Sequence, residues 1–201
     1  FATNGPSSWT QMPWIDSSGN GWASNSDHCG WSRIECFDNL LIHKIRLSCG
    51  DSGLCGGIRG QLPAELSLVS TMKLLDFHFN TDISGTIPKE IGRLTSLTWL
   101  DLNGLTGLDQ GPVPPELFVP SLEWLGLSNS QFTGRLPDSI NNLNNLKEVY
   151  LFGNDFTGGS LNGLCDTLED PAAIDCDDGF ECNCCREGDA LWNFGADCPA
   201  G

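Results

Sequence analysis

Two segments of the chain, SLTWLDL at residues 96–102 and SLEWLGL at residues 121–127, repeat one pattern at an interval of 25 residues. Three further segments align with them: IHKIRLS (42–48), MKLLDFHFN (72–80) and LKEVYLFGN (146–154). Apolar residues stand two apart in every copy, which is typical of a β-strand whose alternate side chains face a core. The residues predicted to face that core are Ile45, Leu47, Leu75, Phe77, Leu100, Leu102, Leu125, Leu127, Val149 and Leu151.

A second signature, Gly-x-apolar-Pro, stands between these strand segments. It occurs at residues 60–63, 85–88, 111–114 and 134–137. A unit of about 25 residues is too small to bury its own apolar face, so a core forms only when successive units stack. We therefore expect one solenoid domain of five units, with the longest insertions, 49–59 and 103–110, looped out.

Asparagine follows the strand segment in two of the units, at Asn80 and Asn154. A buried side-chain amide at this point can satisfy backbone groups that no strand pairing reaches. Leu105 and Ser130 stand at the same position in the other two full repeats.

The Gly-x-Ile-Pro signature and the repeat length resemble the plant-type leucine-rich repeat family, found in receptor ectodomains and in secreted wall-protein inhibitors. The resemblance covers roughly residues 20–163. It implies an α/β solenoid, a right-handed superhelix with a short parallel concave sheet and disulfide-stapled caps at both ends.

The segment GWASNSDHCGWSRIEC (21–36) is similar to the N-terminal cap of that family. We therefore divide the chain into an N-terminal cap at 1–41, five leucine-rich repeats at 42–163 and an acidic, Cys-rich C-terminal cap at 164–201. The C-terminal cysteines depart from the plant pattern, and this tail is similar to those of leucine-rich repeat proteins from diatoms and related algae.

The ten cysteines cluster in the two predicted caps and the first insertion. They are Cys29, Cys36, Cys49, Cys55, Cys165, Cys176, Cys182, Cys184, Cys185 and Cys198. Disulfides at the ends of a solenoid compensate for missing stacking neighbours, so we expect a secreted or extracellular protein or the ectodomain of a membrane-anchored one. Cys29 with Cys36 and Cys49 with Cys55 are the natural local pairs, whereas the pairing of the other six stays open.

The formal net charge is −16, from 10 basic and 26 acidic residues. Residues 165–201 hold ten carboxylates against Arg186, which gives −9 for this tail alone. Such a surface repels phosphate backbones and anionic lipids, which argues against nucleic acid and direct membrane binding. The charge is compatible with binding of cationic partners or divalent ions.

Outward residues of parallel strands form columns across the sheet, since neighbouring strands lie about 4.8 Å apart. Trp99 and Trp124 fall in one column, and Asp76, Asp101, Gly126 and Tyr150 fall in the next. His78, Asn103 and Phe152 follow in a third column.

The expected ligand-binding surface is an aromatic strip with carboxylates beside it. Trp99 and Trp124 offer indole faces for a sugar ring or a peptide side chain, and Tyr150 and Phe152 extend them. Gly126 predicts a notch in the strip. Directional hydrogen bonds are expected from Asp76, Asp101 and Asn103, with His78 on the same face. Packing between the two tryptophans alone is the competing interpretation.

His78 between two aspartates resembles a base with its orienting carboxylates, but no nucleophile motif accompanies it, so we predict no enzyme activity. Residues 175–181 contain acidic residues and a glycine as calcium-binding loops do, and residues 182–185 contain closely spaced cysteines as zinc sites do. Neither has the required spacing, and we predict no metal or cofactor.

The predicted function is a non-enzymatic extracellular recognition module that binds a peptide, protein or glycan on its concave face. Two alternatives stay open: an inhibitor of a secreted hydrolase such as a wall-degrading glycosidase, and a matrix adhesion protein. Ice binding would require a regular array of threonine or asparagine, and Thr86, Thr95, Thr133 and Thr157 do not fall on one column. The sequence does not give the ligand, the oligomeric state or any anchor after Gly201.

Overall fold

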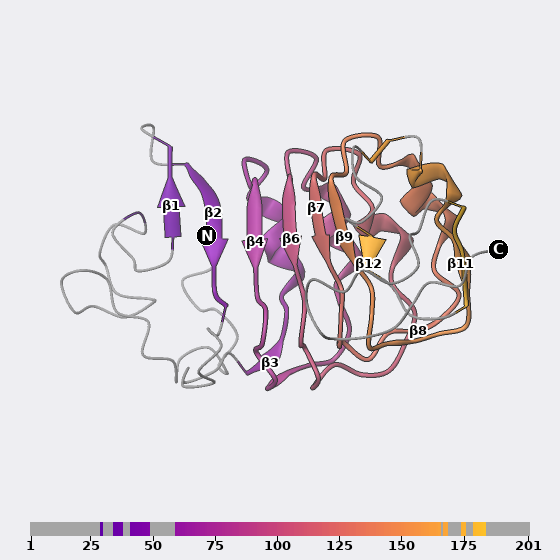
Figure 1. Cartoon of the computed structure of the whole chain (residues 1–201). Helices are drawn as coiled ribbons and strands as arrows, with labels where there is room; N and C mark the ends of the chain where they lie inside the picture. Colours follow the sequence, from indigo (N-terminus) through magenta and orange to yellow (C-terminus); the bar gives the residue numbers. More distant parts are fainter. Residues whose placement is uncertain are drawn as a thin grey trace.

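A seven-stranded sheet forms one side of the molecule (Figure 1). The computed structural model describes residues 29, 34–37, 41–48, 59–165, 167–168, 174–175 and 179–183. In spatial order the strands are β1 (Ile34–Cys36), β2 (Ile42–Arg46), β4 (Leu74–Asp76), β6 (Trp99–Asp101), β7 (Trp124–Gly126), β9 (Glu148–Tyr150) and β12 (Ile174–Asp175). All neighbours are parallel except β1 and β2, which are antiparallel.

The strand register confirms the predicted repeat alignment. Trp99 pairs with Leu74 on one side and with Trp124 on the other, and Trp124 pairs with Glu148. Two strands outside the five repeats join the same sheet, β1 at the N-terminal edge and β12 at the C-terminal edge. The sequence pattern had predicted neither, because both are too short to show a period.

The core lies behind this sheet, and it contains all ten residues that the alternation predicted. Each is at most 3% exposed. The complementary expectation, that the alternate residues between them all face solvent, is wrong at five outward positions. Leu74, Asp76, Asp101 and Ser128 are 7%, 6%, 7% and 1% exposed, and Gly126 is buried as well.

Short 3-10 helices cover the opposite side of the described core. They are η3 (Ala64–Leu68), η4 (Lys89–Arg93), η5 (Pro115–Leu117), η6 (Asp138–Asn142) and η7 (Asn162–Leu164). The first four each start directly after a Gly-x-apolar-Pro signature, with the proline in an extended conformation. Proline fixes φ and has no N–H to donate, so it suits the residue where a helical turn begins.

Short parallel strand pairs connect the units along one flank. They are β3 (Gly60–Gln61) with β5 (Ile83–Ser84), β8 (Thr133–Gly134) with β10 (Asp155–Phe156), and β11 (Gly159–Ser160) with β13 (Phe180–Glu181). Signature glycines Gly60, Gly85 and Gly134 have φ values of 87°, 75° and 75°. A side chain is disfavoured at such angles, which explains the glycine in the signature.

The asparagines after the strands bond to the backbone as predicted. The Asn80 amide donates to the carbonyls of Leu47 and Phe77, each at 2.7 Å. Asn154 donates in the same way to Leu127 and Leu151, each at 2.8 Å. Each amide thus links two successive repeats through carbonyls that the strands leave unpaired.

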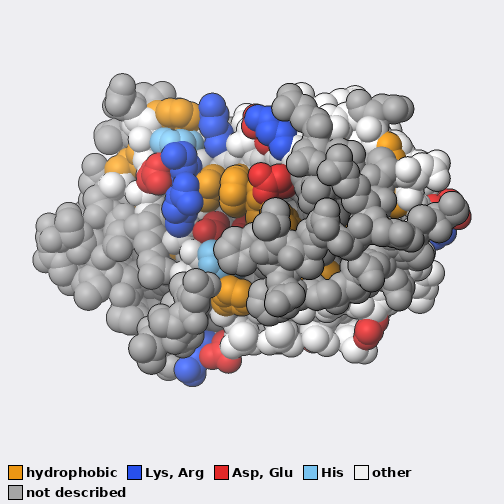
Figure 2. Space-filling model, viewed as in Figure 1, with side chains coloured by type: hydrophobic (Ala, Val, Ile, Leu, Met, Phe, Trp, Pro, Cys, Tyr) orange, Lys and Arg blue, Asp and Glu red, His pale blue; other side chains and the backbone are white. Residues whose placement is uncertain are grey.

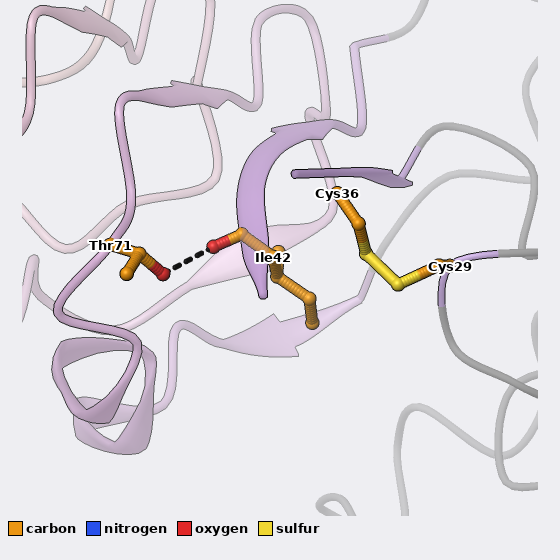
Figure 3. The surroundings of a disulfide bond; sticks show 4 residues. All are labelled: Cys29, Cys36, Ile42 and Thr71. Atoms are coloured by element: carbon orange, nitrogen blue, oxygen red, sulfur yellow. Dashed lines mark hydrogen bonds between the residues drawn. A yellow bond between two sulfur atoms is a disulfide. The ribbon is translucent and has the colours of Figure 1, made fainter. Parts of the chain in front are cut away.

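The predicted Cys29–Cys36 disulfide is present, with the two Cα atoms 5.6 Å apart. Figure 3 shows it beside β2, where Thr71 donates a hydrogen bond of 2.6 Å to the carbonyl of Ile42. Cys165 and Cys182 are also disulfide-bonded. The other six cysteines, Cys49, Cys55, Cys176, Cys184, Cys185 and Cys198, lie outside the described residues. Among the described helices, none has the length and apolar character needed to cross a membrane.

Candidate functional site

Three aromatic side chains form a continuous strip on the outward face of the main sheet, which we call the concave face. The indole rings of Trp99 and Trp124 are parallel, with centroids 4.2 Å apart and an interplanar angle of 1°. Tyr150 continues the row, with its ring centroid 5.3 Å from that of Trp124 and tilted by 39°. Their half-buried side chains confirm the predicted neighbours on an open face.

The ring faces, however, are not as open as the sequence suggested. Trp99 and Trp124 cover one face of each other, and Tyr150 leans toward the second face of Trp124. Trp124, at the centre of the strip, therefore presents mainly its ring edge to a ligand. Edges suit contact with the side chains of a peptide better than stacking on a flat sugar ring.

A carboxylate fixes the outer end of the strip. Glu148 Oε2 accepts hydrogen bonds from Trp124 Nε1, at 3.1 Å, and from the Tyr150 hydroxyl, at 2.8 Å. These bonds hold both rings in one orientation before any ligand arrives, which lowers the entropy lost on binding. Glu148 is in register with Trp124 on the neighbouring strand, and the sequence analysis did not single it out.

The notch predicted at Gly126 is not open. A Cβ atom added there would meet the amide nitrogen of Asn103 and would lie 2.6 and 2.7 Å from two ring carbons of Trp124. The ring and the amide thus occupy the space that the missing side chain leaves. Gly126 lets Trp124 lie flat over the strand, and it does not provide a pocket.

Next to the strip lies a cluster of Asp76, His78 and Asp101. His78 Nδ1 is 2.8 Å from Asp76 Oδ1 and 3.3 Å from Asp101 Oδ2. Each aspartate also accepts a backbone N–H two residues further on, that of His78 at 3.2 Å and that of Asn103 at 3.1 Å. Such local bonds fix the carboxylates at the ends of β4 and β6.

Hydrogen bonds to Asp101 and Asp76 raise the pKa of His78 from 6.5 to about 10, although burial opposes the shift. His78 is therefore protonated at neutral pH and cannot act as the base that its sequence position suggested. The three side chains place ligand atoms within 4.8 Å of one another, a set that can hold a metal ion. A metal there must compete with the proton that His78 shares with both carboxylates.

The third predicted column lies at the strand ends. Asn103 accepts the N–H of Ser128 at 2.7 Å, so it links two repeats. Phe152 is half-buried, and among the described residues no ring stacks on it. The structure thus brings Trp99, Trp124 and Tyr150 together, with Asn103 beside them, and leaves Phe152 apart from the row of rings.

Basic side chains lie on β2, near the N-terminal end of the same face. Lys44 and Arg46 pair with Glu35 at 2.8 and 3.5 Å, and Arg46 is in register with Asp76. Figure 2 shows hydrophobic side chains over the centre of the sheet, with Lys and Arg side chains toward β2 and acidic and His side chains adjoining them. Charge therefore changes sign across the concave face.

Phe79 is a site candidate that the sequence analysis missed. Its side chain is 46% exposed, and its ring meets that of His78 edge to face, with centroids 5.3 Å apart. In the sequence it reads as an ordinary residue between His78 and Asn80. Aligning the repeats could have identified it, because Phe79 stands at the position of Gly104 and Gly153, and phenylalanine is unusual at a position that elsewhere holds glycine.

Known families and proteins resemble this chain in sequence. The family model described as Leucine Rich Repeat matches residues 121–143. Receptor-like protein 39 of Arabidopsis thaliana is 31% identical over 128 residues, which is 51% of this chain and 14% of that protein. Polygalacturonase inhibitor 1 of the same plant is 32% identical over 82 residues, 41% of this chain and 24% of the inhibitor. The chain thus spans less than a quarter of either relative.

Solved structures also resemble the fold. A plant ice-binding protein has a TM-score of 0.67 at 25% identity and covers 88% of this chain and 55% of its own. The BIR3–SERK2 complex from Arabidopsis thaliana gives 0.59 at 25% identity and covers 80% of each chain. The receptor kinase HAESA, solved with the peptide hormone IDA and the co-receptor SERK1, gives 0.51 at 31% identity over 63% of this chain and 20% of that chain.

Proposed function

Because the chain is built from leucine-rich repeats of the plant type, we propose that it is a non-enzymatic extracellular recognition module whose concave face binds an extended peptide or protein segment. The observation that carries this proposal is the strip formed by Trp99, Trp124 and Tyr150. Its rings are held in place by stacking and by Glu148, and they remain partly exposed. Rigid, partly exposed aromatic side chains are typical anchors of protein interfaces.

A peptide ligand fits this surface better than a glycan. Sugar rings stack on open aromatic faces, whereas Trp99 and Trp124 cover each other. Basic, acidic and aromatic side chains follow one another from β2 to β9, and a peptide can match such a sequence with successive side chains. The HAESA structure, which contains a peptide hormone, supports this class of ligand by similarity.

Inhibition of a secreted hydrolase is the second candidate, and the similarity to polygalacturonase inhibitors favours it. Peptide recognition and hydrolase inhibition would use the same concave face, so the geometry of that face does not distinguish the two functions. A one-to-one complex with an extracellular glycosidase that survives high salt would favour inhibition. Binding of short peptides without any effect on such enzymes would favour reception.

Matrix adhesion and ice binding have less support. Adhesion would depend on calcium-bridged attachment through the acidic tail, and most of that tail lies outside the described residues. Ice binding needs a regular array of similar side chains, yet Thr133 on β8 pairs with Asp155 on β10. Measuring thermal hysteresis on the purified protein tests the second of these directly.

The main experiment compares Trp99→Ala and Trp124→Ala with the parent protein in a screen of extracellular peptides and oligosaccharides. We expect both substitutions to reduce peptide binding by about tenfold or more, as is usual for an interface anchor. Leu68→Ala is the matched control, because Leu68 is 69% exposed and ends η3 on the opposite side of the core. Circular dichroism of each variant establishes folding, and equal binding by both Trp variants and the parent rejects the strip as the site.

A further inference from the structure

Phe79 has a backbone conformation that its side chain opposes. Its φ is 59°, in the left-handed region, where a residue with a Cβ atom loses roughly 1–2 kcal/mol. The equivalent residues in the other repeats are Gly104, Asn129 and Gly153, with φ values of 70°, 53° and 69°. Glycine and asparagine tolerate this region best, so the repeat fold itself favours either of them at position 79.

Burial of the Phe79 ring does not compensate for this backbone strain. It is 46% exposed, so much of its apolar surface still meets water. Its ring lies over Gly104, where an added Cβ atom would be 2.8 Å from the nearer Cε atom of Phe79. An exposed aromatic side chain held in a strained conformation is a feature that function explains better than stability.

Two carboxylates lie next to this ring, and His78 contacts both of them as well as the ring. Asp76 and Asp101 have side chains only 8% and 10% exposed, and the one cation bonded to them among the described residues is His78. Two carboxylates and one imidazolium leave a net charge of −1. Both hydrogen bonds described for Asp76 reach Oδ1, so its Oδ2 atom has accepting capacity left for a donor arriving from solvent.

We propose that Phe79 and the Asp76–Asp101 pair form a subsite for the guanidinium group of an arginine side chain in a peptide ligand. This inference rests on the proposed function and names the chemistry of its ligand. A guanidinium donates in a planar fork to carboxylates and stacks on aromatic rings, which fits a buried carboxylate pair beside an exposed ring. The net charge of −16 over the whole chain favours the approach of a basic peptide to the protein.

The two parts have separate functions. The carboxylates provide charge-assisted hydrogen bonds, and the ring of Phe79 adds a cation–π contact and excludes water from one side. The positive charge of His78 neutralises one carboxylate and leaves the other for the ligand. The subsite should therefore bind a charged guanidinium more tightly than an uncharged group. A neutral isostere of arginine should therefore lose most of the binding.

The test is an NMR titration of the whole chain with acetyl-Ala-Arg-Ala-amide and with the same peptide carrying citrulline, the neutral isostere of arginine. Amide shifts of residues 74–80 and 99–104 report the subsite. We expect the arginine peptide to bind about tenfold more tightly than the citrulline peptide. Asp101→Asn should remove that preference, and Phe79→Asn should weaken the arginine peptide about threefold.

Phe79→Asn is expected to keep the fold, since asparagine occupies the same position in the fourth repeat at Asn129. Glu116→Gln on η5 is the matched control for charge, because Glu116 is an exposed carboxylate on the opposite side of the core. It should bind the arginine peptide as the parent does.

The outcomes separate this inference from the proposed function. Equal binding of the two peptides on the concave face would overturn the arginine subsite and leave the proposed function standing. An undiminished affinity of Phe79→Asn would remove the ring from the subsite. Shifts of the same amides by calcium or zinc chloride, without shifts by the arginine peptide, would identify a metal site in its place. Failure of the Trp99→Ala comparison is what overturns the proposed function.

Discussion

The indole rings of Trp99 and Trp124 lie parallel to within 1°, with their centroids 4.2 Å apart, on adjacent strands of the sheet. The strands alone set a spacing of about 4.8 Å, so the rings lean slightly toward each other. Gly126 permits this arrangement, because the ring of Trp124 occupies the place of a side chain there.

Gly126→Ala should therefore disturb the stack without unfolding the protein. The new methyl group would lie 2.6 Å from a ring carbon of Trp124 and would also meet the Asn103 amide, so the ring must leave its present position in the stack. Overpacking of this kind costs about 1–3 kcal/mol. We expect the near-UV circular dichroism of the coupled indoles to fall. Gly111→Ala is the control, since nothing lies within 4 Å of a Cβ atom there, and an unchanged spectrum for Gly126→Ala would contradict the described packing.

The His78 pKa predicts how stability depends on pH. Since folding raises this pKa from 6.5 to about 10, the contribution of His78 is complete below pH 6.5 and is lost as the pH rises toward 10. Urea unfolding at pH 6 and pH 9.5 should show a larger loss for the parent than for His78→Gln. A second measurement is the imidazole C–H resonance, which should not titrate between pH 6 and 8. An ordinary titration near pH 6.5 would show that the bonds to Asp76 and Asp101 do not form.

Two buried serines should respond oppositely to alanine. Ser128 and Ser130 are 1% and 0% exposed, but the Ser128 hydroxyl has no hydrogen-bond partner. The Ser130 hydroxyl donates toward the carbonyls of Leu102 and Ser128 at 2.6 and 2.9 Å, and accepts the N–H of Leu105 at 3.2 Å. Ser130→Ala should lower the free energy of unfolding by about 1–3 kcal/mol, whereas Ser128→Ala should leave it unchanged or raise it.

Chemical denaturation of the two variants side by side measures this difference. Each change removes one oxygen atom from a buried serine, so the two variants create similar small cavities and differ mainly in hydrogen bonding. A loss for Ser128→Ala as large as that for Ser130→Ala would mean that Ser128 has a partner in solution, such as a buried water molecule.

Phe79→Asn should raise stability by about 1 kcal/mol, because the backbone strain at φ 59° is relieved. Gly104→Ala should do the opposite, since it adds a side chain at φ 70° and brings it against the Phe79 ring. In the double variant Phe79→Asn/Gly104→Ala, the cost of the contact with the Phe79 ring should disappear, and only the cost of a side chain at φ 70° should remain. A thermal-unfolding cycle measures the coupling, and strictly additive effects would contradict the contact between the ring of Phe79 and Gly104.

Repeat length and alternation were enough to predict the solenoid, the ten core positions and the register that aligns Trp99 with Trp124. These follow from the sequence because a strand period of two assigns every side chain to one face, and the apolar face of each unit has no other place to be buried. The interrepeat bonds of Asn80 and Asn154 follow for the same reason, since a repeated turn leaves the same carbonyls unpaired each time.

What lies on the outward face depended on contacts between repeats, which no period encodes. Alternation placed Asp76 and Asp101 outward but could not show that both are buried and share the proton of His78. It likewise gave no sign that Trp124 would lie over Gly126, or that Phe79 would take a left-handed φ. The sequence by itself determined which residues face the core, because that follows from alternation along one strand. Only the tertiary structure decided how the outward side chains lean, because each is positioned by a neighbour from the next repeat.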